Sequence, residues 1–264
     1  MKMKKTIAVL AILLVLSASV FAGGSKEKVE KTELTVFAAA SMTETLTTIK
    51  GLYEKAHPEV TIVYNFDSSG TLKTQIEQGA DCDLFVSAAL KQMNALTDLG
   101  MIDTATKVNL LENKTALAVP AGNPKGIKSF DQLAAALKAG QVFLAIGNQD
   151  VPVGQYTQKI FAYYSIDEAA VAGNLTYGSN VKEVTTQVKN TSVDCGIIYA
   201  TDAFSAGLEV VDTATEAMTG GRVIYPVAVL SGAKNHDAAV NFLEYLKSAE
   251  AMQVFAGVGF ASAL

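Results

Sequence analysis

Two short segments near the front of this chain place serine hydroxyls where a strand pattern gives way to a helix pattern. They are residues 37–41 (FAAAS) and residues 67–71 (DSSGT), and neither contains Lys or Arg. The N–H groups at a helix N-terminus lack intrahelical partners and carry the positive end of the helix dipole. Together with hydroxyls they can hold a multiply charged oxyanion without a basic side chain. The two segments therefore predict a neutral anion site that contains Ser41 and Ser69.

A serine in such a position also has a purely structural interpretation, because serine is a favoured N-cap. We expect Ser41 to cap a helix that starts at Met42. One serine turn alone does not distinguish a helix cap from a binding site. Similar helix starts in the second half of the chain favour the binding site.

The second half contributes two further helix starts and a phenol. Pro152 is suited to the first turn of a helix, and Asn180 can cap a helix whose first N–H groups include that of Val181. Tyr199 ends an apolar strand pattern, where it is either a half-buried aromatic or a ligand contact. Four helix N-termini and this phenol could surround one tetrahedral anion.

These positions are placed by an alternation of strand and helix patterns, which indicates an α/β fold. A first series of such units precedes a turn-rich connector at residues 121–126, and a second series follows it. Extended apolar strands at residues 116–120 and 223–230 join the two series, and one amphipathic helix at 238–256 ends the chain. We expect two lobes, each a mainly parallel sheet flanked by helices, with the ligand cleft between them.

The domain boundaries follow from this organisation. Residues 1–24 are expected to be a signal peptide and residues 25–31 a flexible tether. Residues 32–119 and 224–264 are assigned to lobe 1, and residues 120–223 to lobe 2.

The N-terminus reads as an export signal, with three lysines in the first five residues, an apolar stretch, and a small-residue cleavage site. The mature protein is therefore expected in the periplasm or at the outer face of the cytoplasmic membrane. Gly24 stands where a bacterial lipoprotein would carry its lipid-bearing Cys, so the sequence does not support a lipid anchor.

The charge balance argues against nucleic-acid binding. The net charge is −5 for the whole chain, and it becomes −8 without the signal peptide, which contains three lysines and no acids. Any attraction for an anion must therefore come from local donors in a closed pocket. Cys82 and Cys195 lack metal-ligand spacing. Export permits a disulfide between them, but two unpaired buried thiols are the favoured interpretation.

An exported serine hydrolase is the rival class of function. The chain contains no G-x-S-x-G turn. His57 lies in a His-Pro turn and His236 in a polar segment before the last helix, so both are expected to be solvated. Dinucleotide and P-loop motifs are also absent from the sequence, and we expect no enzymatic activity and no cofactor.

Six segments, in order and at compatible spacing along nearly the whole mature chain, resemble the bacterial periplasmic molybdate-binding protein family. These are residues 36–41, 68–72, 83–88, 151–154, 196–199 and 225–229. The resemblance implies the type II periplasmic-binding-protein fold and a protein that delivers molybdate to the membrane permease of an ABC importer. It also implies a monomer.

The resemblance further implies how the site is built. Ser41 and Ser69 would give hydroxyl and main-chain contacts, Val153 and Val181 main-chain N–H groups, and Tyr199 its phenol. No direct cation ligand for a metal is implied. This chain departs from the commoner pattern, with Gly70 at a third serine position and Val153 where Ala is frequent.

A pocket made of donors suits a fully deprotonated tetrahedral anion and disfavours hydrogen phosphate, whose proton needs an acceptor. Cavity size must then distinguish molybdate from the smaller sulfate, whereas tungstate should bind as molybdate does. Sulfate, thiosulfate or another small oxyanion remains the alternative cargo.

Overall fold

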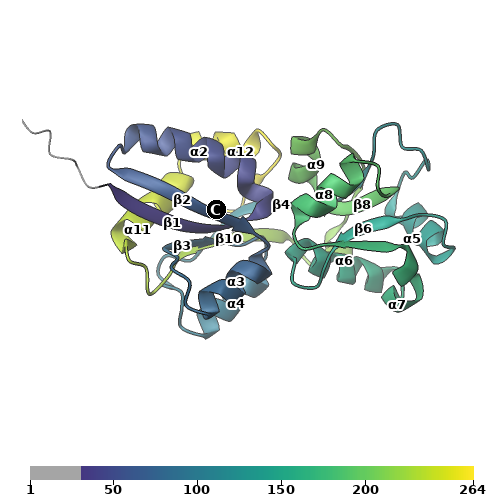
Figure 1. The fold of residues 1–264 in the computed structure, drawn as a ribbon, viewed down its shortest axis with the longest axis horizontal. Coiled ribbons are helices and arrows are strands. Elements are labelled where there is room, and N and C mark those ends of the chain that lie inside the picture. The colour runs from purple at the N-terminus through teal and green to yellow at the C-terminus, as the bar shows by residue number, and fades with distance from the viewer. Residues whose placement is uncertain (1–30) are drawn as a thin grey trace, which may run out of the picture. The chain divides into compact units, whose positions relative to one another are not determined.

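The computed structural model describes residues 31–264, which fold into two lobes, each built on one β-sheet (Figure 1). The predicted signal peptide and all but the last residue of the predicted tether lie outside the described residues. Within residues 31–264, no helix is long and apolar enough to cross a membrane.

The sheet of lobe 1 has six strands in the order β11-β4-β10-β3-β1-β2. Strands β2, β1, β3 and β4 run in one direction, while β10 and β11 run against them. The bounds of the strands are β1 Thr32–Ala39, β2 Val60–Asp67, β3 Leu84–Val86, β4 Val108–Asn113, β10 Val223–Val229 and β11 Ala261–Ser262.

The sheet of lobe 2 has five strands in the order β7-β6-β8-β5-β9, and only β5 runs against the other four. The bounds are β5 Thr115–Val119, β6 Leu144–Gly147, β7 Leu175–Gly178, β8 Cys195–Tyr199 and β9 Glu209–Thr213. The α/β fold with two lobes is confirmed, but both sheets are mixed and not mainly parallel, because the strands that join the lobes, β5 and β10, pair antiparallel with their neighbours.

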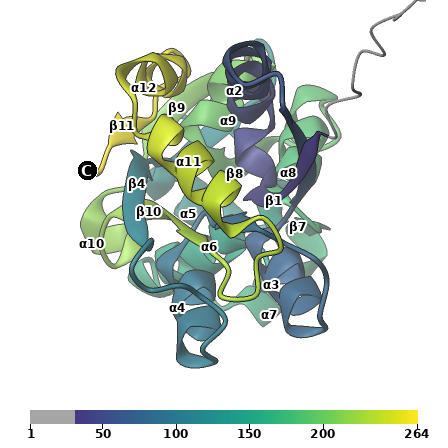
Figure 2. The same cartoon turned by 90° about the vertical axis from the view of Figure 1, so that its left-hand side faces the viewer.

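Helices cover both faces of each sheet (Figures 1 and 2). Those of lobe 1 are the short 3-10 helix η1 Ala40–Met42, α2 Thr43–Ala56, α3 Ser69–Glu77, α4 Leu90–Asp98, α11 His236–Leu246 and α12 Ala249–Ala256. Those of lobe 2 are α5 Phe130–Lys138, α6 Pro152–Tyr163, α7 Glu168–Val171, the 3-10 helix η2 Ala172–Asn174, α8 Val181–Lys189, α9 Ala200–Ala206 and α10 Glu216–Thr219.

The alternation of strand side chains explains why lobe 1 has helices on both faces. Phe37 and Phe85 pack with Leu72 of α3 and Leu96 of α4 in one buried cluster. Their strand neighbours, such as Val36, belong to the larger core instead. Because successive side chains of a strand point to opposite faces, each face carries its own apolar layer and needs its own helices.

The chain crosses between the lobes where β4 passes into β5 and again just before β10. Residues 115–119, which the sequence assigned to lobe 1, form β5 and pair with β8 and β9 of the second sheet. The lobe boundary therefore lies at Lys114 and not after residue 119. The expectation failed because a continuous extended run of residues gives no sign of the single residue at which it changes sheet.

The predicted C-terminal helix at 238–256 is wrong in one respect, since it is two helices. α11 ends at Leu246, and Ser248 then caps α12 by accepting the N–H of Ala251 at 3.2 Å. A serine side chain that competes for backbone N–H groups favours such a restart.

Candidate functional site

The loops that follow the parallel strands of the two sheets meet around one small cavity. In lobe 1 these loops follow β1, β2 and β3, and in lobe 2 they follow β6, β7 and β8, so both carboxyl edges face the cavity. The cavity is small, with a volume of about 10 Å³. It is lined by Ala39, Ala40, Ser41, Asp67, Ser68, Ser69, Ala88, Val151, Pro152, Val181 and Tyr199.

Ser41 is buried at the cavity but does not cap a helix. It lies inside η1, and Met42, which precedes α2, makes no side-chain cap. The expected cap is wrong because a 3-10 turn separates β1 from the α-helix. The Ser41 hydroxyl instead lies 3.0 Å from the hydroxyl of Tyr225.

Asn113 also bonds Tyr225. Its side-chain amide donates to the Tyr225 hydroxyl at 3.2 Å and to the Thr201 hydroxyl at 2.9 Å. The Tyr225 oxygen therefore accepts from Asn113, and its own proton is available to Ser41. In the arrangement in which Tyr225 donates to Ser41, the Ser41 proton is available to an acceptor in the cavity.

Ser69 is the first residue of α3 and is fully buried. Its neighbour Ser68 is the N-cap, and its hydroxyl oxygen accepts the N–H of Thr71 at 3.1 Å. The Ser69 hydroxyl oxygen accepts the N–H of Ala88 at 2.9 Å. This contact with the loop after β3 holds the side chain in place and leaves the hydroxyl proton to donate.

In lobe 2, two helix starts lie at the cavity. Pro152 is the first residue of α6 and lines the cavity together with Val151, whereas Val153 is fully buried behind that lining. Val181 is the first residue of α8 and lines the cavity. The predicted cap of this helix is confirmed, since the Asn180 side chain accepts the N–H of Glu183 at 3.1 Å.

Tyr199 ends β8 with its hydroxyl buried, and within residues 31–264 this hydroxyl has no hydrogen-bond partner. Its ring packs edge-on against that of Tyr225, with centroids 5.7 Å apart. Burial raises the pKa of Tyr199 well above its ordinary value, so the phenol stays protonated at neutral pH. A buried hydroxyl without a partner is costly, and an acceptor in the cavity would remove that cost.

No Lys, Arg or His lines the cavity, but one carboxylate does. Asp67 accepts the N–H of Ser68 at 2.7 Å and the side-chain amide of Asn180 at 3.4 Å. It therefore supports the start of α3 and also joins the two lobes. The absence of a basic side chain from this lining agrees with the sequence analysis, whereas the Asp67 carboxylate was not expected in a pocket made of donors.

A partly exposed ion cluster around the buried Asp202 lies beside the site. Lys182 contacts Asp202 at 3.0 Å and reaches across to Glu44 of lobe 1 at 2.7 Å. Burial raises the pKa of Asp202 to about 6, although Lys182 opposes this shift. Burial lowers the pKa of Lys182, but Asp202 and Glu44 raise it, and the net shift is upward.

The lobes also touch through backbone at Gly70. A Cβ atom at this position would lie 2.1 Å from the carbonyl oxygen of Asp150 in lobe 2. That distance is far shorter than any van der Waals contact. The lobes reach the arrangement seen here because residue 70 has no side chain.

The structure brings Ser41, Ser69, Val181 and Tyr199 together around the cavity, with Val153 one residue beyond its lining. The supporting contacts from Ala88, Asn113 and Tyr225 were not predicted from the sequence. Two of these three lie in segments 83–88 and 225–229, which carried the family resemblance. The role of Asn113 could not be predicted, because a single Asn between two apolar segments is typical of a turn.

Several features argue against a serine hydrolase site and a metal site. His57 stacks on Tyr53 with ring centroids 4.3 Å apart, and His236 contacts Asp103 at 2.9 Å, so neither histidine is bound to a serine of the site. Cys82 and Cys195 are unpaired and buried, as predicted, and burial raises the pKa of each thiol to about 12. In the part of the chain that the structure describes, no group of His, Cys, Asp and Glu could hold a metal ion.

Comparison with known proteins gives consistent matches. A family model described as bacterial extracellular solute-binding protein matches residues 34–261. A Bacillus subtilis protein provisionally named ABC transporter substrate-binding lipoprotein YvgL is 36% identical over 256 residues, which is 96% of each chain. The Escherichia coli molybdate-binding protein ModA is 34% identical over 249 residues, or 91% of this chain and 93% of the relative.

A solved structure shares the fold. The Azotobacter vinelandii periplasmic molybdate-binding protein superposes with a TM-score of 0.76 at 18% identity, covering 86% of this chain and 98% of that chain. At this identity the superposition supports the two-lobed architecture alone.

Proposed function

Because the chain belongs to the bacterial extracellular solute-binding proteins, of the type that serves ABC importers, we propose that it captures molybdate and delivers it to a membrane permease. The family membership confirms the resemblance seen in the sequence. Members of this family bind solutes and are not enzymes, so the serine hydrolase hypothesis has no support left. Molybdate as the cargo is our proposal, as are tungstate binding, the monomeric state and the absence of a cofactor.

The observation that carries the proposal is the set of hydrogen-bond donors around the cavity. The hydroxyls of Ser69 and Tyr199 each have a proton without an acceptor among the described residues, and Ser41 has its proton available when Tyr225 donates to it. The first N–H groups of α3 and α8 belong to Ser69 and Val181, which line the same cavity. A tetrahedral dianion accepts hydrogen bonds at every oxygen and matches this set.

The size of the cavity restricts the cargo to a compact ion. Its volume of about 10 Å³ is at the limit for one water molecule, so sugars and peptides do not fit while the lobes are closed. A tetrahedral oxyanion requires the donors of the two lobes to move slightly apart. Charge cannot separate molybdate, tungstate and sulfate, since all three are dianions. The separation must come from the distance between donors that are fixed on two lobes.

Hydrogen phosphate differs from molybdate because it carries a proton that needs an acceptor. Asp67 brings a carboxylate to the cavity, which could accept the phosphate proton. One Asp67 oxygen accepts two hydrogen bonds, from Ser68 and from Asn180, whereas the other has no partner among the described residues. Asp67 thus weakens the argument from the sequence against phosphate, and the titration below compares phosphate with molybdate directly.

The proposal is tested by calorimetric titration of refolded, anion-free protein with molybdate, tungstate, sulfate and phosphate. Micromolar or tighter binding of molybdate and tungstate, with little competition from sulfate, supports it. Preferential sulfate binding would instead assign the chain to the alternative cargo. Mass analysis of the released ligand tests the serine hydrolase hypothesis, because a binding protein releases its ligand unchanged, whereas a hydrolase does not.

A further inference from the structure

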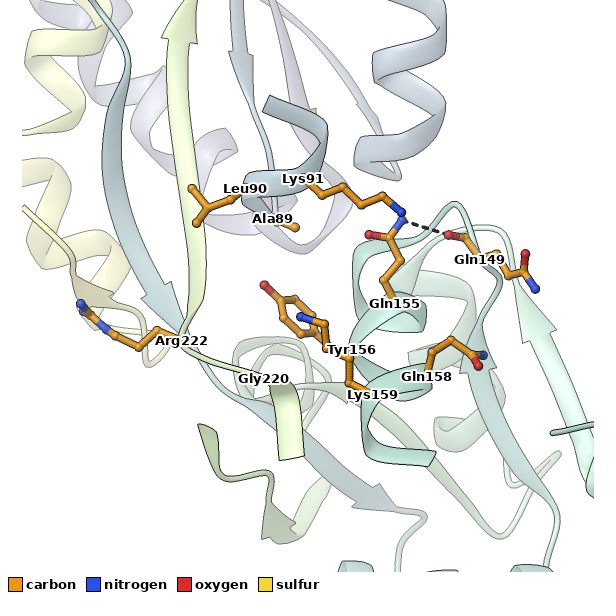
Figure 3. A pocket seen from close by; sticks show the side chains of 10 residues that line it. All are labelled: Ala89, Leu90, Lys91, Gln149, Gln155, Tyr156, Gln158, Lys159, Gly220 and Arg222. Atoms are coloured by element: carbon orange, nitrogen blue, oxygen red, sulfur yellow. Dashed lines mark hydrogen bonds between the residues drawn. The ribbon is translucent and has the colours of Figure 1, made fainter. Parts of the chain in front are cut away.

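A crevice of about 470 Å³ lies next to the anion cavity and is formed by both lobes (Figure 3). Lobe 1 contributes Ala89 and Lys91, lobe 2 contributes Tyr156 and Lys159, and Arg222 lies just before β10. Ala89 directly follows Ala88, which lines the anion cavity, and Tyr156 lies one helical turn beyond Pro152. The linings of the crevice and of the cavity therefore lie next to each other on both lobes.

The crevice gathers positive charge, in contrast to the cavity. Within residues 31–264, neither Lys91 nor Lys159 has a carboxylate within salt-bridge distance. The Lys159 ammonium lies 5.2 Å from the centre of the Tyr156 ring (Figure 3), which holds it at the crevice by a cation–π contact. Arg222 is already paired with Glu112.

A smaller hollow continues the crevice and shares Lys91, Gln149 and Gln155 with it. Besides Lys91, its charged residues are Lys73, which pairs with Glu77 at 2.7 Å, and Asp150. Within these two hollows, the two unpaired lysines therefore outweigh the one unpaired carboxylate.

We propose that this crevice is an entrance site that collects oxyanions from solution before the lobes close, with Lys91 and Lys159 as its cationic groups. The inference rests on the proposed function. A chain of net charge −5 repels a dianion as a whole, and the cavity contains no cation to offset that repulsion. Local cations at the cleft raise the rate of encounter without contacting the bound ion.

The entrance site separates two tasks. The lysines attract any small oxyanion by charge, while the neutral donors of the cavity select among oxyanions by size. Lys91 and Lys159 lie on different lobes, so both flank the opening before closure. Both are exposed, and their replacement should leave folding intact.

The test is a stopped-flow measurement of molybdate association, followed by tyrosine fluorescence, since the chain has nine Tyr and no Trp. We expect Lys91→Gln/Lys159→Gln to lower the association rate constant about three- to tenfold at low salt, with an unchanged dissociation rate constant. The difference should shrink at about 0.5 M salt, because screening removes it. The matched control is Lys55→Gln/Lys189→Gln, which removes the same charge from exposed lysines at the far ends of α2 and α8.

Equal association rates for the two double variants would overturn the entrance site while leaving the proposed function in place. A faster dissociation in Lys91→Gln/Lys159→Gln would also overturn it, because the lysines would then contact the bound ion. If the unaltered protein binds no oxyanion at all, the proposed function fails and the entrance site fails with it.

Discussion

At the scale of single residues, Tyr199 is the most informative side chain of the site. Its hydroxyl is buried without a partner, so Tyr199→Phe removes no hydrogen bond from the free protein. We expect the variant to keep its thermal stability but to bind molybdate about 10- to 100-fold more weakly, which corresponds to about 1.5–3 kcal/mol for a hydrogen bond to a charged group. Calorimetry and thermal unfolding measure the two effects.

The matched control for this variant is Tyr177→Phe. Tyr177 is half exposed in the same lobe, and its hydroxyl donates to Glu168 at 2.7 Å, away from the cavity. Unchanged molybdate affinity in Tyr199→Phe would remove the phenol from the site. Weaker binding in both variants would point to a general effect on lobe 2.

Asp202 is the residue through which pH should affect stability. Its pKa rises from 3.8 to about 6 on burial, so between these values the folded state holds a proton that the unfolded state has lost. The contribution of Asp202 to the free energy of unfolding therefore falls as pH rises from about 4 to 6, and this contribution is constant above that range. Asp202→Asn removes this contribution. The free energy of unfolding of the variant minus that of the unaltered protein should therefore rise by up to about 3 kcal/mol between pH 4 and pH 7.

Urea unfolding at several pH values tests this prediction. The comparison must be made between proteins at each pH, because other carboxylates titrate in both. Asp98→Asn, at an exposed position, gives the baseline. Parallel stability profiles for Asp202→Asn and the unaltered protein would show that the ion cluster does not carry the dependence.

At the scale of secondary-structure elements, the contact between the start of α3 and the loop before α6 determines whether the lobes can close. Gly70→Ala places a methyl group where Asp150 has its carbonyl oxygen, and both partners are backbone, so neither moves easily. We expect at least a tenfold loss of molybdate affinity with little loss of stability. Small-angle scattering should show that molybdate no longer compacts the variant.

Gly51→Ala is the control for this substitution. Gly51 lies in α2, and a Cβ atom there would have no neighbour within 4 Å. That change should stabilise the helix by about 1 kcal/mol and leave binding unchanged. Normal affinity in Gly70→Ala would mean that the bound form is more open than the arrangement described here.

Local patterns predicted the elements well and the contacts between them poorly. Pro152 and Asn180 mark the starts of α6 and α8 because their effects act within one helical turn. Ser41 was assigned a capping role because the sequence does not separate a 3-10 turn from an α-helix. The partners of Ser41 and Ser69, which are Tyr225 and Ala88, come from distant strands, so no spacing along the chain reveals them.

At the scale of the whole molecule, the two lobes must be able to open for an ion to reach a cavity whose Ser69 and Tyr199 are buried. The two crossings between the lobes run through extended backbone at β5 and β10. Asn113 stands at one crossing and bonds both Tyr225 and Thr201, so the hinge and the site share one hydrogen-bond network. Closure and ion binding should therefore be coupled, since each supplies partners that the other needs.

The ion pair between Glu44 and Lys182 should add to that coupling, because it joins the lobes in the closed arrangement. The Glu44 carboxylate is about half exposed, so its contribution is small, about 0.2–1 kcal/mol. We expect Glu44→Gln to weaken molybdate binding about two- to fivefold at low salt, with the loss shrinking as salt is added. Glu244→Gln removes a pair of similar length, with Lys247 at the end of α11, and it should leave the affinity unchanged because that pair does not join the lobes. If both variants bind molybdate equally well, closure depends on the ion and on the Gly70 contact, and not on charges across the cleft.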